Sequence, residues 1–223
     1  MCGIFGSTKL ERFKTLYTLN QERGNFAYGG LYIQDAIFEV QRGPGIVKIA
    51  PVHSSKYHFG HTQAPTSSER EFSREASHPF LYGDWIVAHN GVLSNTTSII
   101  EEYWIGSPPS TVNNVDSSII PALIDHCYIG EDNSENEITA ITEALEIIKG
   151  TFGLWIYNTK SHNAYIARVG STLFVDNRFG RFSSSQDPYS TLKPIEEGIL
   201  YKVEPYEFTQ VGKFRYNSPF FIL

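Results

Sequence analysis

The chain opens with MCGIFG (residues 1–6), a short apolar run in which Cys2 directly follows the initiator methionine. Methionine is generally trimmed when the next residue is small, so we expect Cys2 to become the first residue of the mature chain. Its thiol and a free α-amine would then belong to one residue, which combines a nucleophile with a base. The simpler interpretation is a small buried cysteine without chemistry. The run itself predicts a buried first strand.

The composition indicates a globular chain with a sizeable core, since 41% of its 223 residues are hydrophobic. No linker or repeat divides the sequence, so we expect a single domain over residues 1–223. No apolar run approaches the roughly 18 residues of a membrane span, and no basic start precedes an apolar run as in a signal peptide. A net charge of −6 without a Lys/Arg cluster argues against nucleic-acid binding.

The two cysteines, Cys2 and Cys127, do not form a disulfide framework, and a bond between them would consume the candidate nucleophile. We therefore expect a reducing, cytoplasmic location. The seven histidines have no metal-ligand spacing, so we expect neither a metal nor another cofactor.

The spacing of apolar residues predicts helices at residues 9–23, 96–104, 116–127 and 136–149. Strands are expected at residues 2–7, 29–40, 46–50, 56–62, 84–88, 152–158, 163–169, 173–176, 182–184, 198–203 and 207–211. Residues 66–77 are polar and fit an exposed loop. This order predicts one α+β domain with two sheets and helices packed outside them.

His89, Asn90 and Gly91 follow a predicted strand. In isolation, Asn-Gly indicates a tight hairpin turn. The functional interpretation is an oxyanion hole, in which the Asn90 side-chain amide and the Gly91 N–H donate to a developing negative charge. Glycine would let the backbone approach closely there.

Other polar positions have ordinary interpretations when taken singly. His61 and Thr62 fit a satisfied buried pair, and Asp116 fits a helix N-cap. Arg23 and Gly24 fit the end of a helix.

Together, and in this order, these motifs resemble the glutaminase domain of class II glutamine amidotransferases, which are N-terminal-nucleophile (Ntn) hydrolases. The family's Met-Cys-Gly-Ile start, Arg-Gly loop and His-Asn-Gly segment are matched at residues 1–4, 23–24 and 89–91. Its Gly-His-Thr-Arg-x-x-Thr segment is matched at residues 60–66 with one change. Weaker similarities occur at residues 76–79, 115–117, 150–152, 168–171 and 182–184. The resemblance covers nearly the whole chain and implies a four-layer αββα sandwich of two mainly antiparallel sheets.

The resemblance implies that the Cys2 thiolate attacks the side-chain amide of L-glutamine, with the α-amine of Cys2 as base. Asn90 and the Gly91 N–H would hold the oxyanion, ammonia would leave, and water would release glutamate from a thioester. It also implies that Asp116 binds the substrate α-ammonium, and that Arg23 and Gly24 lie near the nucleophile.

In the family, an arginine of the His-Thr-Arg segment pairs with the substrate carboxylate, and Thr66 would line the same end of the substrate. Here that arginine position holds Gln63, which cannot neutralise a carboxylate. Arg70 or Arg74 in the following polar loop could supply the charge instead. The alternatives are a different amide with an uncharged end, or loss of glutaminase activity.

Family members usually carry a synthetase beyond this domain, and we expect none within these 223 residues. The leading hypothesis is a stand-alone glutaminase domain that feeds ammonia to a separate acceptor subunit. The alternatives are an Ntn amidase for another amide, and a catalytically silent module that binds a partner. The aromatic tail over residues 214–223 would either pack on the core or dock a partner.

Overall fold

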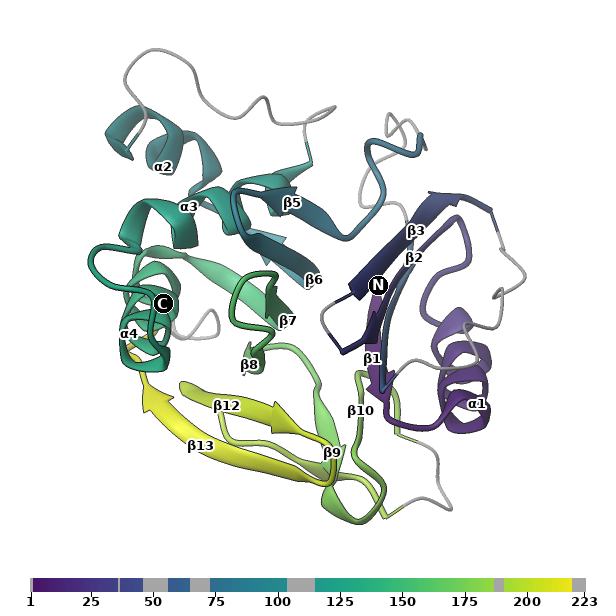
Figure 1. The fold of residues 1–223 in the computed structure, drawn as a ribbon. Helices are drawn as coiled ribbons and strands as arrows, with labels where there is room; N and C mark the ends of the chain where they lie inside the picture. Colours follow the sequence, from purple (N-terminus) through teal and green to yellow (C-terminus); the bar gives the residue numbers. More distant parts are fainter. Residues whose placement is uncertain are drawn as a thin grey trace.

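The computed structural model describes residues 2–35, 37–45, 56–64, 73–103, 115–186 and 191–217. Two antiparallel sheets lie face to face, with α1 outside one sheet and α2, α3 and α4 outside the other (Figure 1). This arrangement confirms the expected α+β class and the αββα order of layers.

The first sheet has seven strands in the order β11-β9-β10-β1-β4-β2-β3, so β1 lies at its centre. Its strands are β1 (Gly3–Ser7), β2 (Ala27–Gln34), β3 (Ile37–Pro44), β4 (Tyr57–Gln63), β9 (Phe174–Asp176), β10 (Arg181–Ser183) and β11 (Lys193–Pro194). Helix α1 (Leu10–Gln21) covers its outer face, and a 3₁₀ turn, η3 (Asn177–Phe179), joins β9 to β10.

The second sheet has six strands in the order β13-β12-β8-β7-β6-β5. Its strands are β5 (Phe80–Tyr82), β6 (Trp85–Leu93), β7 (Gly150–Asn158), β8 (Ala164–Val169), β12 (Ile199–Glu204) and β13 (Glu207–Lys213). The helical layer over it contains α2 (Thr96–Tyr103), the 3₁₀ turn η2 (Asp116–Ile119), α3 (Ile120–Cys127) and α4 (Ser134–Ile147). None of the described helices is long and apolar enough to cross a bilayer.

The alternation of side chains along β1 explains why the side chain of Cys2 lies between the two sheets. Successive residues of a strand point to opposite faces. Phe5 packs in the cluster beneath α1, whereas Ile4 packs in the cluster between the sheets. Both side chains are fully buried. Cys2 lies two residues before Ile4, so its side chain falls on the inter-sheet side, next to the second sheet.

The predicted helices are confirmed, with ends shifted by a few residues and with 116–127 beginning as the 3₁₀ turn η2. The single strand expected at 29–40 is wrong. The chain forms a hairpin of β2 and β3 there, and Asp35 at its tip has a φ of 51°, a conformation that aspartate tolerates. The short strands β5 and β11 were missed because two or three residues carry no periodic signal. The strand expected at 46–50 lies outside the described residues.

The segment His89–Asn90–Gly91 is not a turn, because β6 continues through it to Leu93 and pairs with β7 along its whole length. The last described part of the chain is anchored by Phe214, which is 3% exposed and joins the core between the second sheet and its helices. Residues 218–223 of the aromatic tail lie outside the described residues.

Candidate active site

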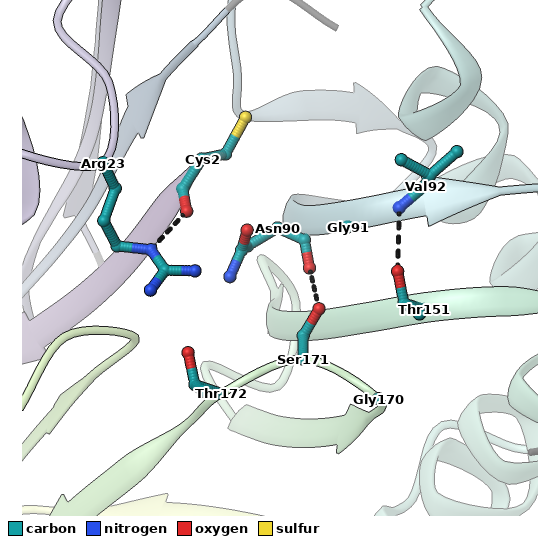
Figure 2. A pocket seen from close by; sticks show the side chains of 9 residues that line it. All are labelled: Cys2, Arg23, Asn90, Gly91, Val92, Thr151, Gly170, Ser171 and Thr172. Atoms are coloured by element: carbon teal, nitrogen blue, oxygen red, sulfur yellow. Dashed lines mark hydrogen bonds between the residues drawn. The ribbon is translucent and has the colours of Figure 1, made fainter. Parts of the chain in front are cut away.

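A cavity of about 420 Å³ lies at the end of β1 against the second sheet (Figure 2). The residues that line it come from separate segments: Cys2, Arg23, Asn90, Gly91, Val92, Thr151, Gly170, Ser171 and Thr172. Four of the residues singled out from the sequence, Cys2, Arg23, Asn90 and Gly91, therefore meet in one place. Arg23 is the only charged side chain among the described residues of this wall.

Cys2 immediately precedes β1 and is 6% exposed. Its thiol donates to the carbonyl oxygen of Ala64 across 3.8 Å. Cys2 and Cys127 are not joined by a disulfide bond. Because β1 is paired on both sides, by β4 and β10, the residue that precedes it is attached to a rigid central strand.

Arg23 follows α1 and holds the backbone at Cys2. Its Nε donates to the Cys2 carbonyl oxygen at 2.8 Å (Figure 2). Its terminal N–H donates to the Ser184 carbonyl oxygen at 3.4 Å. Burial lowers the pKa of the Arg23 guanidinium, and the charge of Cys2 acts in the opposite direction. Arg23 and Cys2 line the same cavity.

Asn90 and Gly91 belong to β6, opposite Gly153 and Phe152 of β7. The backbone carbonyl oxygen of Asn90 accepts a hydrogen bond from the Ser171 hydroxyl at 3.0 Å. The side-chain amide of Asn90 donates to the Ser184 hydroxyl at 3.1 Å. Both ends of Asn90 are therefore held by hydroxyl groups.

Gly91 has a φ of 153°, outside the range that other residues adopt readily. A Cβ at this position would lie 1.9 Å from the Thr151 carbonyl oxygen. The close approach in the structure is to the neighbouring strand β7, whereas the approach to a substrate oxyanion stays a prediction.

Asp116 lies beside the end of β6 but is not among the described residues that line the cavity. Its carboxylate accepts from the backbone N–H of Leu93 and of Ser117, each at 2.8 Å. The Ser117 hydroxyl in turn lies 2.7 Å from Nδ1 of His89. Asp116 thus connects the end of β6 to the start of η2, rather than capping a later N–H of its own helix.

Gln63, at the end of β4, is 1% exposed and is likewise absent from the described lining of the cavity. Gly24 does not line it either, and a Cβ on Gly24 would lie 2.4 Å from the Ala64 backbone nitrogen. Gly24 is therefore required by the close packing of its loop against the end of β4.

The arginines proposed as carboxylate partners are Arg70 and Arg74, in the polar segment after β4. Thr66 and Arg70 lie outside the described residues. Arg74 is exposed. It lies close enough to Arg42 to help lower the pKa of that guanidinium, which burial lowers most.

His61 and Thr62 are both buried in β4, as expected. Nε2 of His61 lies 3.0 Å from the His89 carbonyl oxygen, and the Thr62 hydroxyl donates to the Asn20 carbonyl oxygen at 2.8 Å. They connect β4 to β6 and to α1, so they support the site without lining it.

Six residues at the site have no role that could be predicted from the sequence: Val92, Thr151, Gly170, Ser171, Thr172 and Ser184. Several lie in segments that the resemblance matched, at 150–152, 168–171 and 182–184. Their types carry no chemical signal by themselves, because isolated Ser, Thr and Gly are common in ordinary loops and strand ends.

No protein-family model matches the chain. The solved structure of the glutamine phosphoribosylpyrophosphate (PRPP) amidotransferase from B. subtilis superposes on 97% of this chain with a TM-score of 0.74 and 17% identity, over 50% of its own length. This chain has the class II glutamine amidotransferase fold. The fold is that of the Ntn hydrolases, as the sequence motifs implied.

Two curated relatives are similar in sequence to most of this chain. The 7-cyano-7-deazaguanine synthase of Saccharolobus solfataricus is 25% identical over 205 residues, which are 86% of this chain and 42% of that protein. The glutamine–fructose-6-phosphate aminotransferase of Listeria innocua is 24% identical over 209 residues, which are 89% of this chain and 34% of that protein. The chain thus spans less than half the length of these relatives.

Proposed function

We propose that this chain hydrolyses the side-chain amide of glutamine through the thiol of Cys2 and supplies the released ammonia to an acceptor enzyme. The observation that carries the proposal is that Cys2, Arg23, Asn90 and Gly91 line the same cavity. The fold and the glutamine-dependent relatives support the same reaction class.

The first step would be attack of the Cys2 sulfur on the carboxamide carbon. After removal of Met1, the α-amine of Cys2 would take the thiol proton. A model α-amine has a pKa of about 7.7–8.0, so an appreciable fraction is neutral near pH 7. Arg23 would keep the Cys2 backbone in place and add a positive charge beside the developing thiolate.

The second step would be collapse of the tetrahedral intermediate. Its oxyanion would accept hydrogen bonds from the Asn90 side-chain amide and the Gly91 N–H, and loss of one such donor costs about 2.7–4 kcal/mol of activation free energy. The C–N bond breaks, the nitrogen takes the proton held by the amine, and ammonia leaves. Water then attacks the γ-glutamyl thioester, which releases glutamate and restores the thiol.

The family's binding scheme for the substrate's amino-acid end differs in this chain, because Gln63 is neutral and is not among the described residues that line the cavity. This observation favours a second candidate, an Ntn amidase for an amide whose far end carries no carboxylate. In the glutaminase proposal, Arg70 or Arg74 binds the carboxylate, Thr66 lines that end, and Asp116 binds the α-ammonium.

The acceptor of the ammonia is proposed from the relatives. Each matches this chain over only part of its own length, and each is named as a synthase or an aminotransferase. We propose that this chain works with such an enzyme, which consumes the ammonia.

The proposal is tested with 6-diazo-5-oxo-L-norleucine, a glutamine-shaped electrophile, and intact-mass analysis of the purified protein. We expect loss of Met1 and one covalent adduct, which is absent in Cys2→Ala and retained in the matched control Cys127→Ala. Retention of Met1, or an adduct that survives Cys2→Ala, would contradict the Cys2 mechanism.

A second measurement separates the candidate substrates. Ammonia release is compared for glutamine and for simple amides that lack the amino-acid end. Faster release from glutamine supports the glutaminase, whereas faster release from the simple amides supports the second candidate. Loss of Met1 without ammonia release from any of them favours a silent partner-binding module.

A further inference from the structure

Ser184 lies directly after β10, is 1% exposed and contacts four separate segments at the candidate site. Its hydroxyl oxygen accepts from the Asn90 side-chain amide and from the Ile4 backbone N–H, each at 3.1 Å. Ile4 belongs to the first sheet and Asn90 to the second. One hydroxyl therefore joins the strand that follows Cys2 to the side chain proposed to bind the oxyanion.

The backbone of Ser184 is held independently of this hydroxyl. Its N–H donates to the Ile4 carbonyl oxygen at 2.8 Å. Its own carbonyl oxygen accepts from the Thr172 hydroxyl at 2.7 Å and from Arg23 at 3.4 Å. Removal of the hydroxyl alone would leave these three contacts in place, so a Ser184→Ala variant isolates the hydroxyl's effect on Asn90 and Ile4.

We infer that Ser184 is a positioning residue for the amide of Asn90. This inference rests on the proposed function, in which Asn90 stabilises the oxyanion. An asparagine amide carries two N–H groups. One is bound to Ser184, which fixes the plane of the amide and leaves the second for a ligand.

Loss of the hydroxyl would free the amide to rotate, because the terminal torsion of asparagine has a broad, shallow energy profile. The oxyanion exists only in the transition state and the intermediate. The effect should therefore fall on kcat and leave KM nearly unchanged.

Ser183 provides a matched control within the same chain. It is adjacent to Ser184 and 0% exposed, and its hydroxyl also accepts two N–H groups. Those groups are the Asn20 side-chain amide at 2.9 Å and the Ser185 backbone N–H at 3.1 Å. Asn20 belongs to α1, so the Ser183 hydroxyl faces the outer helix and not the cavity.

The experiment compares glutamine hydrolysis by the wild type, Ser184→Ala, Ser183→Ala and Ser184→Thr. We expect Ser184→Ala to lower kcat by roughly 10- to 100-fold, because misplacing a catalytic group by about 1 Å can cost about 100-fold. Ser183→Ala should lower the melting temperature but keep kcat within about two-fold, the range of an uninvolved residue. Ser184→Thr, which keeps a hydroxyl, should recover most of kcat.

An equal kcat in both alanine variants would overturn the inference while leaving the proposed function intact, as would an effect of Ser184→Ala on KM alone. If the wild type hydrolyses no glutamine, the proposed function fails and the contact is tested without substrate. The side-chain ¹⁵N–H₂ signal of Asn90, assigned with Asn90→Asp, should shift in Ser184→Ala and stay in place in Ser183→Ala. An unshifted signal in Ser184→Ala would overturn the inference.

Discussion

Replacing Gly91 with alanine should impair both folding and catalysis, for two separable reasons. The backbone at Gly91 has a φ of 153°, and a residue with a side chain is strained by about 1–3 kcal/mol in such a conformation. The new Cβ would also lie 1.9 Å from the Thr151 carbonyl oxygen, where ordinary contact begins at 3.4 Å. The two strands would therefore have to separate locally by about 1.5 Å, the difference between those two distances.

Overpacking of this kind typically costs about 1–3 kcal/mol. Added to the backbone strain, it predicts a loss of about 2–6 kcal/mol in the free energy of unfolding, or roughly 4–24 °C in the melting temperature of a domain of this size. The local separation of β6 and β7 also displaces the Gly91 N–H, which is a proposed oxyanion donor, by more than about 1 Å. The value of kcat should therefore fall by at least roughly 100-fold.

Two other glycines of the chain separate strain from clash. A Cβ on Gly43 meets nothing within 4 Å, and its φ is not positive. A Cβ on Gly45 also meets nothing, but its φ is 82°. Thermal unfolding and glutaminase rates of the three alanine variants should thus rank Gly43→Ala as mildest and Gly91→Ala as most severe. If Gly91→Ala melts and turns over like Gly43→Ala, the close approach of β7 is not what requires glycine there.

Three further outcomes follow from other parts of the molecule. Asn20→Ala removes a buried amide that binds the Ser183 hydroxyl, so the free energy of unfolding should fall by about 1–3 kcal/mol in a urea titration, with kcat nearly unchanged. Burial, aided by the Glu143 carboxylate, raises the pKa of Cys127 to about 11. Its reactive thiolate is thus scarce at pH 8, so iodoacetamide should modify Cys2 alone there and Cys127 only as the pH approaches 11; double modification at pH 8 would contradict this. Asn133 caps α4 through its side chain, and Asn133→Ala should cost about 1 kcal/mol by thermal unfolding, whereas no change would show that the cap contributes nothing.

Much of the fold could be predicted from local patterns. The amphipathic spacing over residues 9–23 and 136–149 was sufficient for α1 and α4, because one helical face must be apolar to pack on a sheet. The longer strands of the second half were equally clear, since β-rich runs there alternate with polar turns, whereas the two-residue β11 was missed. The hairpin of β2 and β3 was not, because the run through residues 29–40 contains no glycine or proline at its tip to mark the reversal.

The sequence by itself determined the chemically distinctive groups: a cysteine at position 2, an asparagine–glycine pair, and an arginine–glycine pair after a helix. Rare residue types in a fixed order carry that information locally. Only the tertiary structure decided what surrounds them. The contact of Ser184 with Asn90 joins residues 94 positions apart, and Ser184 also binds Ile4, 180 positions away. The contact with Asn90 depends on how the two sheets stack, and the contact with Ile4 depends on the pairing of β1 with β10. A serine has no local pattern that reveals either partner.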